Sequence, residues 1–537
     1  MPTDPRDQAP TAPRRTGRVR ATLSGPRLLA GLAALLIAPG ALGVAALTSE
    51  TPTPAPAATT EPHEPLPQVP DSVARAQLDR SAQATRQARR LTAPALLDAV
   101  GPAGTGSLPT LALAPRDTPY TLVELRTLAP AAFTDLPDPN ASGGAVLVGA
   151  HIEVPLGAAL LLDTHTPDVR LTSSPDGFAT IISRGTVDIS GSDDAAVAVS
   201  SWNPQLGAPD TEIADGRSFV LQVGGRMDVA HARFEFLGFG TGTSSGVAWR
   251  GAAADTGSSE RVKVQGTVTS SVFAHNHFGA YTHEAQAMVW ENNTFADNNE
   301  YGFDPHDFSD DFLVTANTAR GNGKHGFIFS RGCNSNVLRG NYAYDNAGHG
   351  FMIDDGRSAQ TAEAQSRIDA SNDNVITGNV AYDNANSGVE IEGGSGNVVS
   401  GNTLTGNDIG VRIKDRASAA VTGNTIVDSD RYGINVLESG GHVPLTDNRI
   451  SGSWAAINLE SADSATVGVN TSTDVTTPLV VDSVVTYDTT WLDELATYVR
   501  WNPLLVLWGL ILGVPIMVSV VRLVGSPFLR RRPVYAS

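Results

Sequence analysis

HGFIFSRGCNSNVLRGNYAYDNAGHGFMID, residues 325–354, contains one full period of the repeat that decides the fold. Each repeat opens with a glycine and a short strand of alternating side chains. The glycines are Gly279, Gly302, Gly326, Gly350, Gly388, Gly410 and Gly433. Their spacings are 23, 24, 24, 38, 22 and 23 residues. A period of 22 to 24 residues with two or three short strands predicts an all-β parallel β-helix, whose coils stack about 4.8 Å apart.

A second repeat runs between the glycines and consists of asparagines. They are Asn293, Asn317, Asn341, Asn379, Asn402, Asn424, Asn448 and Asn470. Because stacked coils bring equivalent positions together, we expect these side chains to form an internal ladder of amides. A leucine-rich horseshoe has a similar period, but leucine is not periodic here. The one long spacing contains a polar insertion at 355–370, which we interpret as either a lid or a surface loop.

Composition narrows the classes of function. The chain has 537 residues and a formal net charge of −19, which argues against the basic footprint that nucleic-acid binding needs. Its 53 glycines and scarce aromatic residues are typical of a turn-rich β protein. The single cysteine, Cys333, excludes an intrachain disulfide.

Two apolar segments, 28–47 and 503–521, each approach the length of about 20 residues that crosses a bilayer. Arginine-rich tails precede the first segment (1–27) and follow the second (522–537). By the positive-inside rule both termini are cytoplasmic and everything between the segments is extracytoplasmic. A cleaved signal peptide is the alternative for the first segment. The sequence therefore predicts a cell-membrane protein whose β-helix is flanked by two transmembrane helices.

The region between these segments divides into three parts. Residues 48–71 are a proline-rich linker. Residues 72–92 form a polar, arginine-rich helix, with Asp71 as its expected cap. From about residue 105 to 490, short apolar runs broken by Gly, Asp and Asn predict the β-helix.

YGFDPHDFSDD, residues 301–311, crowds four acids around one histidine within this repeat. Because side chains alternate along a strand, residues one and three places after each glycine point into the core, and residues two and four places after it point outward. This register puts the DPHD segment on an outward-facing strand rather than in a turn. Pro305 points inward, where it removes a backbone donor and marks a special site. The stacked outward residues predict a long groove of mixed charge, which suits an extended polymer.

The segment 301–341 resembles the catalytic core of alginate (mannuronan) C-5 epimerases. The string YGFDPHD matches both the periplasmic and the secreted types, KHGFIFSR resembles the periplasmic type, and GNYAYDNAGHGF resembles the secreted type. The similarity extends over roughly residues 145–460. The resemblance implies a right-handed parallel β-helix that inverts C5 of uronates within a polymer, with no metal and no organic cofactor.

The resemblance also implies roles for four residues. His306 would be the base that removes the C5 proton, and Arg331 would neutralise the substrate carboxylate. Asp304 would orient the substrate or His306. Tyr301 matches a tyrosine implicated in proton transfer, so either Tyr301 or water would return the proton. Since Asp304 and Asp307 favour the histidine cation and Arg331 opposes it, we expect these effects nearly to cancel and His306 to titrate near neutral pH.

Further charged and aromatic residues on or beside the outward face are candidates for binding an anionic polysaccharide. They are Asp307, Arg250, His283, Lys324, His325, Asp354, Arg412 and Lys414. Charges on a solvated β-helix face are common, so an ordinary surface role is the alternative for each of them.

Two other functions remain open at this point. A polyuronate lyase would share the proton abstraction at C5 but then expel the C4 substituent. A non-catalytic, membrane-tethered carbohydrate-binding or assembly protein would not need His306. The calcium-binding modules of the secreted epimerases are absent, and a C-terminal span is not part of either type. The polymer could therefore be another polyuronate, and partners could include a polysaccharide synthesis or secretion complex.

Overall fold

The computed structural model describes residues 66–98, 108–137, 144–240, 242–253, 261–357, 369–462 and 464–481. The chain divides into two compact units, Met1–Ala55 and Pro56–Ser537, and all described residues belong to the second. The expected apolar spans at 28–47 and 503–521 lie outside the described residues. Within the described ranges, no helix is both long enough and apolar enough to cross a membrane.

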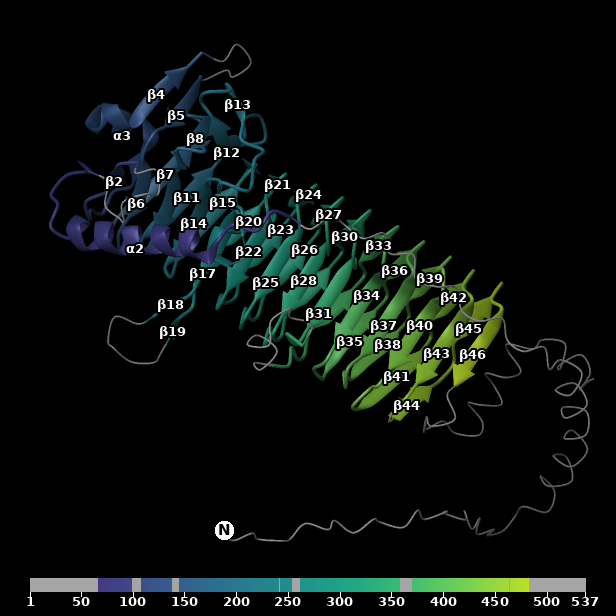
Figure 1. Ribbon diagram of the computed structural model, residues 1–537. Helices are drawn as coiled ribbons and strands as arrows, with labels where there is room; N and C mark the ends of the chain where they lie inside the picture. Colours follow the sequence, from purple (N-terminus) through teal and green to yellow (C-terminus); the bar gives the residue numbers. More distant parts are fainter. Residues whose placement is uncertain are drawn as a thin grey trace, which may run out of the picture. The chain divides into compact units, whose positions relative to one another are not determined.

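Three parallel sheets run along the described part of the chain, as the stacked ribbons of Figure 1 show. They contain 15, 13 and 16 strands among the described residues. The first sheet carries the candidate site. Its strands are β1 (Ala95–Leu97), β2 (Thr110–Ala112), β6 (His151–Val154), β10 (Thr180–Ser183), β14 (Phe219–Val223), β17 (Val247–Arg250), β22 (Ala280–His283), β25 (Phe303–His306), β28 (Phe327–Ser330), β31 (Phe351–Asp354), β34 (Ser387–Glu392), β37 (Ile409–Lys414), β40 (Tyr432–Leu437), β43 (Ala455–Glu460) and β46 (Thr477–Val481).

Each coil takes one strand from each sheet. β28 is followed by β29 (Val337–Arg339) in the second sheet and by β30 (Tyr342–Tyr344) in the third. Neighbouring coils pair in parallel register, for example Phe327 with Phe351. Their two rings stack with centroids 5.0 Å apart, and both side chains are fully buried. The predicted parallel β-helix and the inward direction of these positions are confirmed.

The expected asparagine ladder is present in full. From Asn293 to Asn470, each Nδ2 donates to the Oδ1 of the next coil's asparagine over 2.9–3.1 Å. A second ladder runs from Asn298 to Asn407, and a third runs from Asn336 to Asn397. The repeat of asparagines had predicted only the first of the three ladders. Each buried amide thus satisfies its polar groups within the stack, which is what permits so many asparagines inside a core.

Two helices cover the N-terminal coils. α3 (Leu122–Leu128) inserts Leu122 and Leu125 into the main core. α2 (Asp71–Ala88) occupies most of the range expected for a helix, 72–92, but Asp71 is its first residue and Pro70 is the cap. The polar composition of α2 follows from the polar sheet face that it covers. Arg80 donates to Thr110 (3.2 Å) and Thr180 (3.0 Å) on the first sheet.

We expect Asn341→Ala to lower the free energy of unfolding by about 2–4 kcal/mol, because it leaves several buried partners unsatisfied. Asn341 accepts from the backbone and side chain of Asn317 and donates to Asn379 and to the carbonyl of Val314. Urea unfolding of the full-length protein measures the change. Asn299→Ala, outside the three ladders, is the matched control. Equal effects of the two substitutions would contradict a stabilising role of the ladder.

Candidate active site

The candidate site lies on the outward face of the first sheet, around β22, β25 and β28. Two columns of side chains run along this face. The position-2 column, two places after each glycine, contains Tyr281, Asp304, Ile328, Met352, Glu390 and Arg412. The position-4 column contains His283, His306, Ser330, Asp354, Glu392 and Lys414. Strand pairing aligns His283 with His306, and His306 with Ser330, as the sequence register predicted.

The backbone turns immediately after His306. Asp307 and Phe308 have φ values of 38° and 62°, and Arg331, one coil later, has a φ of 53°. The prediction that the whole DPHD segment is strand is therefore wrong for Asp307. The same left-handed turn follows the first-sheet strand on other coils, at Glu284, Asp415 and Glu438, so it is a regular feature of the coil. The turns bring the side chains of Asp307 and Arg331 together.

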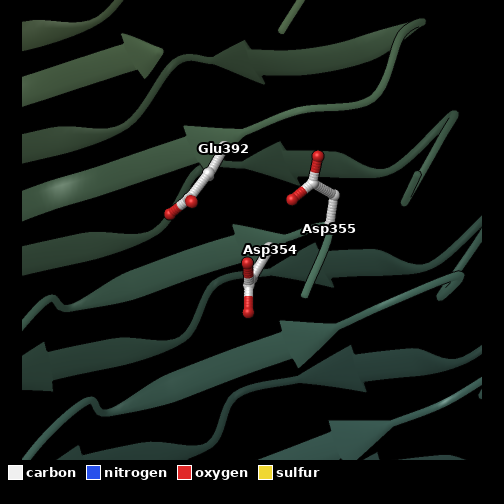
Figure 2. Close-up of side chains that lie close together, drawn as sticks. All are labelled: Asp354, Asp355 and Glu392. Carbon is white, nitrogen blue, oxygen red and sulfur yellow. The ribbon is translucent and has the colours of Figure 1, made fainter. Parts of the chain in front are cut away.

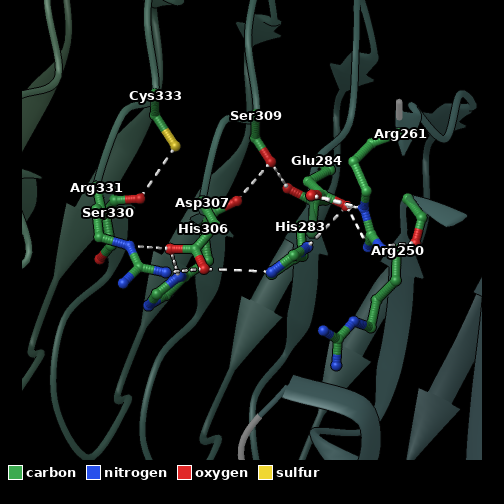
Figure 3. A network of polar contacts seen from close by, with 12 residues as sticks. Arg250, Arg261, His283, Glu284, His306, Asp307, Ser309, Ser330, Arg331 and Cys333 are labelled. Carbon is green, nitrogen blue, oxygen red and sulfur yellow. Dashed lines mark hydrogen bonds and ion pairs between the residues drawn. The ribbon is translucent and has the colours of Figure 1, made fainter. Parts of the chain in front are cut away.

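Asp307 is the hub of the polar network in Figure 3. Its Oδ1 accepts a hydrogen bond from Nδ1 of His306 (2.7 Å) and another from Nε of Arg331 (2.6 Å). Its Oδ2 accepts from Nη2 of Arg331 and lies 3.2 Å from Nε2 of His283. Burial disfavours the charged carboxylate, but these hydrogen bonds outweigh burial and hold the pKa of Asp307 well below its usual value.

His306 remains partly accessible, with 35% of its side chain exposed. Burial lowers the pKa of its imidazole. The hydrogen bond to Asp307 and the negative charges of Asp304 and Asp307 raise it, and Arg331 lowers it. The net shift is upward, so the carboxylates prevail over burial and the arginine. The effects of the carboxylates and of Arg331 were expected nearly to cancel. They do not, and the pKa of His306 is raised above 6.5.

Asp304 lies on the position-2 column and is almost fully buried. Its Oδ1 has no hydrogen-bond partner in the described part of the chain. Burial raises the pKa of this carboxyl to about 7, with the charge of His306 opposing the shift. Asp304 is therefore protonated more readily than an ordinary aspartate. Asp307, rather than Asp304, makes the hydrogen bond that orients His306.

Two tyrosines lie near Asp304: Tyr281 is on the preceding coil in the same column, and Tyr301 is on the same coil, just before Gly302. The ring of Tyr281 lies 5.9 Å from that of His306, and Tyr301 stacks on His325 with centroids 5.4 Å apart. Burial raises the pKa of both phenols, so both keep their protons at neutral pH. Tyr281 follows the outward register but had no predicted role. The sequence does contain a sign of such a role, because Tyr281 stands two places after its glycine, as Asp304 does on the next coil.

An acidic cluster lies further along the groove. Asp354, Asp355 and Glu392 are buried, and their carboxylate oxygens lie within 4.8 Å of one another, as Figure 2 shows. Burial and the charge of Glu392 raise the pKa of Asp354 to about 6. The cluster has protein cations of its own, because Arg357 pairs with Asp355 (2.8 Å) and Lys414 pairs with Glu392 (3.0 Å).

Several predicted binding residues already have partners. Lys324 pairs with Glu300 (2.6 Å). Nη1 of Arg412 lies 3.8 Å from Glu390, and Lys414 also pairs with that carboxylate (3.2 Å).

Two further predicted residues are held by hydrogen bonds. Arg250 donates to the hydroxyl of Thr243 (2.8 Å). Nδ1 of His325 accepts from the backbone of His349 (3.0 Å). Burial holds the pKa of His325 well below 6.5, so this ring is neutral.

Comparison with known proteins identifies similar epimerase sequences. The mannuronan C5-epimerase of Pseudomonas syringae pv. tomato is 30% identical over 179 residues, which cover 32% of this chain and 31% of the relative. The mannuronan C5-epimerase of Pseudomonas aeruginosa is 28% identical over 217 residues, covering 40% and 38%. Over these regions the chain is similar in sequence to the mannuronan C5-epimerases. It matches about a third of the length of these curated relatives.

Family models and solved structures support the fold of this chain. The model of a right-handed β-helix region matches residues 243–366, and that of the periplasmic copper-binding protein NosD matches residues 355–485. The crystal structure of the periplasmic alginate epimerase AlgG superposes with a TM-score of 0.54 at 19% identity, covering 70% of this chain and 85% of that chain. The expected resemblance is therefore confirmed at the level of sequence relatives and fold.

We expect Asp307→Asn to lower the pKa of His306, because the substitution removes a carboxylate and leaves the charge of Arg331 uncompensated. NMR titration of histidine-labelled full-length protein measures this pKa, with the signal assigned by loss in His306→Gln. Asp310→Asn is the control, since Asp310 pairs with Lys263 instead. An unchanged or higher pKa in Asp307→Asn would show that Asp307 is not the group that raises it.

Proposed function

We propose that this protein inverts C5 of uronate residues within a polysaccharide, converting mannuronate to guluronate in an alginate-like polymer. One observation carries the proposal: His306 and Arg331 lie on neighbouring coils of one outward face and share the carboxylate of Asp307. A base and a cation beside each other are what proton abstraction next to a carboxylate needs.

The hydrogen bonds support a role for each of the two side chains. Nδ1 of His306 is bound to Asp307, which leaves Nε2 to remove the C5 proton. Arg331 uses Nε and Nη2 to bind Asp307. Figure 3 shows its third nitrogen pointing away from Asp307, where it can meet the substrate carboxylate and neutralise the developing enolate. Tyr301 or water then returns a proton from the opposite face.

The other predicted site residues would play different parts around the reacting sugar. Asp307 acts through His306 and Arg331, and His283 supports Asp307 from the preceding coil. Asp354 follows the reacting centre along the position-4 column and can bind sugar hydroxyls. Lys414 and Arg412 keep the carboxylate of Glu390 charged, so their contribution to binding a polyanion is reduced.

We also propose that the epimerase domain is extracytoplasmic and anchored in the membrane. The support is the apolar length of 28–47 and 503–521 and the arginines outside both segments. This placement would put the domain where a polymer leaves the cell, beside a synthesis or secretion complex.

Full-length protein incubated with polymannuronate in deuterated water should produce guluronate with deuterium at C5, as read by proton NMR. His306→Asn should lower the rate by about 100- to 10,000-fold, the usual contribution of a general base. Arg331→Lys should also lose most activity, because lysine cannot form the bidentate pair. His442→Asn and Arg339→Lys, at exposed positions on another sheet, are the matched controls.

Each other outcome of this experiment points to a different function. Unsaturated chain ends that depend on His306 would identify a lyase with the same base. Retention of polymer binding without any reaction, in wild type and His306→Asn alike, would identify a binding protein.

The pH dependence provides a separate test. The base must be neutral, so kcat/KM should rise as pH rises through the pKa of His306, and the raised pKa places this limb above pH 6.5. Asp304→Asn removes a negative charge that raises this pKa, so the limb should move to lower pH. Asp311→Asn, at an exposed turn, should leave it in place. A limb that stays fixed in Asp304→Asn would argue against His306 as the titrating base.

A further inference from the structure

The position-2 column changes character on the N-terminal side of the site. Strand pairing continues it backward from Tyr281 through Ala248, Leu221 and Ile182. These three residues point outward, yet they are apolar and fully buried. After His306 the position-2 column begins with the apolar Ile328 and Met352, and the two columns then contain carboxylates, Lys414 and the paired amides of Asn435 and Asn458. The position-2 column is therefore apolar over three consecutive coils before Tyr281, whereas most of the charged side chains of this face follow His306.

The N-terminal segment covers the apolar part of this face. Leu66, Val69, Val73, Ala74 and Leu78 pack against a cluster that contains Ile182, Leu221, Ala248 and Tyr281. This cluster is separate from the main core inside the coils. Figure 1 shows α2 lying over the same end of the first sheet.

Hydrogen bonds fix the helix further toward the end of the stack. Ser81 (3.0 Å) and Thr85 (2.6 Å) donate to the buried carboxylate of Glu153, which is also on the position-2 column. Arg184 pairs with the same carboxylate (2.8 Å). Without α2, the buried carboxylate of Glu153 would lose two donors. Without Glu153, Ser81 and Thr85 would lose their acceptor. The cover is therefore an integral part of this face.

A second element closes the face nearer to His306. The 3-10 helix η2 (Gly242–Ser244) lies beside β17, and Thr243 accepts a hydrogen bond from Nη1 of Arg250 (2.8 Å). A Cβ atom at Gly242 would lie 3.3 Å from that Nη1 and 3.8 Å from the hydroxyl of Tyr281. Arg250 thus ties η2 to the position-4 column two coils before His306.

We infer that the groove is closed on the N-terminal side of His306, so that the protein acts on uronates close to one end of a polymer chain. This inference rests on the proposed epimerase function and specifies its substrate. The cover reaches β17, which lies two coil rises before the strand of His306, or about 10 Å at 4.8 Å per coil. Since a coil rise is comparable to one pyranose unit, the reacting sugar is at most about the third from the held end.

The test uses oligomannuronates of two defined lengths, each tagged at the reducing end, with full-length protein in deuterated water. Tandem mass spectrometry locates the deuterium. We expect it within about three residues of one end, and the same end for both lengths, because the cover has a fixed position. Deuterium at residues far from both ends would overturn the inference while leaving the epimerase function intact. No deuterium in any oligomer or in polymannuronate would overturn both.

A pair of variants tests the cover itself. Leu78→Asp puts a charge into the packed side of α2 and should spread deuterium toward interior residues of the longer oligomer. Ser72→Asp adds the same charge at an exposed position of α2 and should retain the wild-type pattern. A folded Leu78→Asp protein with the wild-type pattern would show that α2 does not limit the groove. If Leu78→Asp fails to fold, the deuterium positions produced by the wild-type protein alone test the inference.

Discussion

The in-register stacking of coils is the constraint on which the rest of this structure depends. Parallel pairing places each side chain one strand spacing from its equivalents on the coils before and after. Inside the coils, this produces the asparagine ladders and the stacked aromatic rings. On the outward face it brings charged side chains of adjacent coils within ion-pair distance of one another. Asp307 shows the consequence, since its partners come from the coil before (His283), from its own coil (His306) and from the coil after (Arg331).

This arrangement resolves a conflict between the two groups that the proposed chemistry needs. A free arginine beside the histidine would favour the neutral base but would also be mobile. Asp307 holds the guanidinium in a bidentate pair and so fixes its position. The same carboxylate raises the pKa of His306, which makes a stronger base that is less often neutral. A uronate carboxylate bound to Arg331 would bring a further negative charge to the same place. The protein therefore balances base strength against the fraction of base that is ready to react.

The fold and the columns of the site could be predicted because both follow from periodicity. Once the glycine spacing is known, alternation determines that Asp304 and His306 point outward and that Arg331 lies one coil later. The left-handed turn at Asp307 could not be predicted this way, because it breaks the alternation. The direction of the His306 pKa shift depends on distances of a few ångströms and on burial, which a sequence pattern does not contain. The two other asparagine ladders share the same period, and only the first was recognised.

The position of α2 was beyond sequence analysis for another reason. Its residues, such as Arg80, Ser81 and Thr85, read as a solvated polar helix because their partners are distant in sequence. Glu153 lies 72 residues from Ser81, and Thr180 lies 100 residues from Arg80. A helix that is polar on its buried side can dock only where the sheet face is polar, and a helix with Val73 and Leu78 at its start needs an apolar patch next to it. The outward face has both surfaces next to each other. Glu153 is the polar one, and Ile182, Leu221 and Ala248 form the apolar one on the coils that follow. The N-terminal segment is thus matched to the N-terminal coils, and its cover ends before the coil of His306.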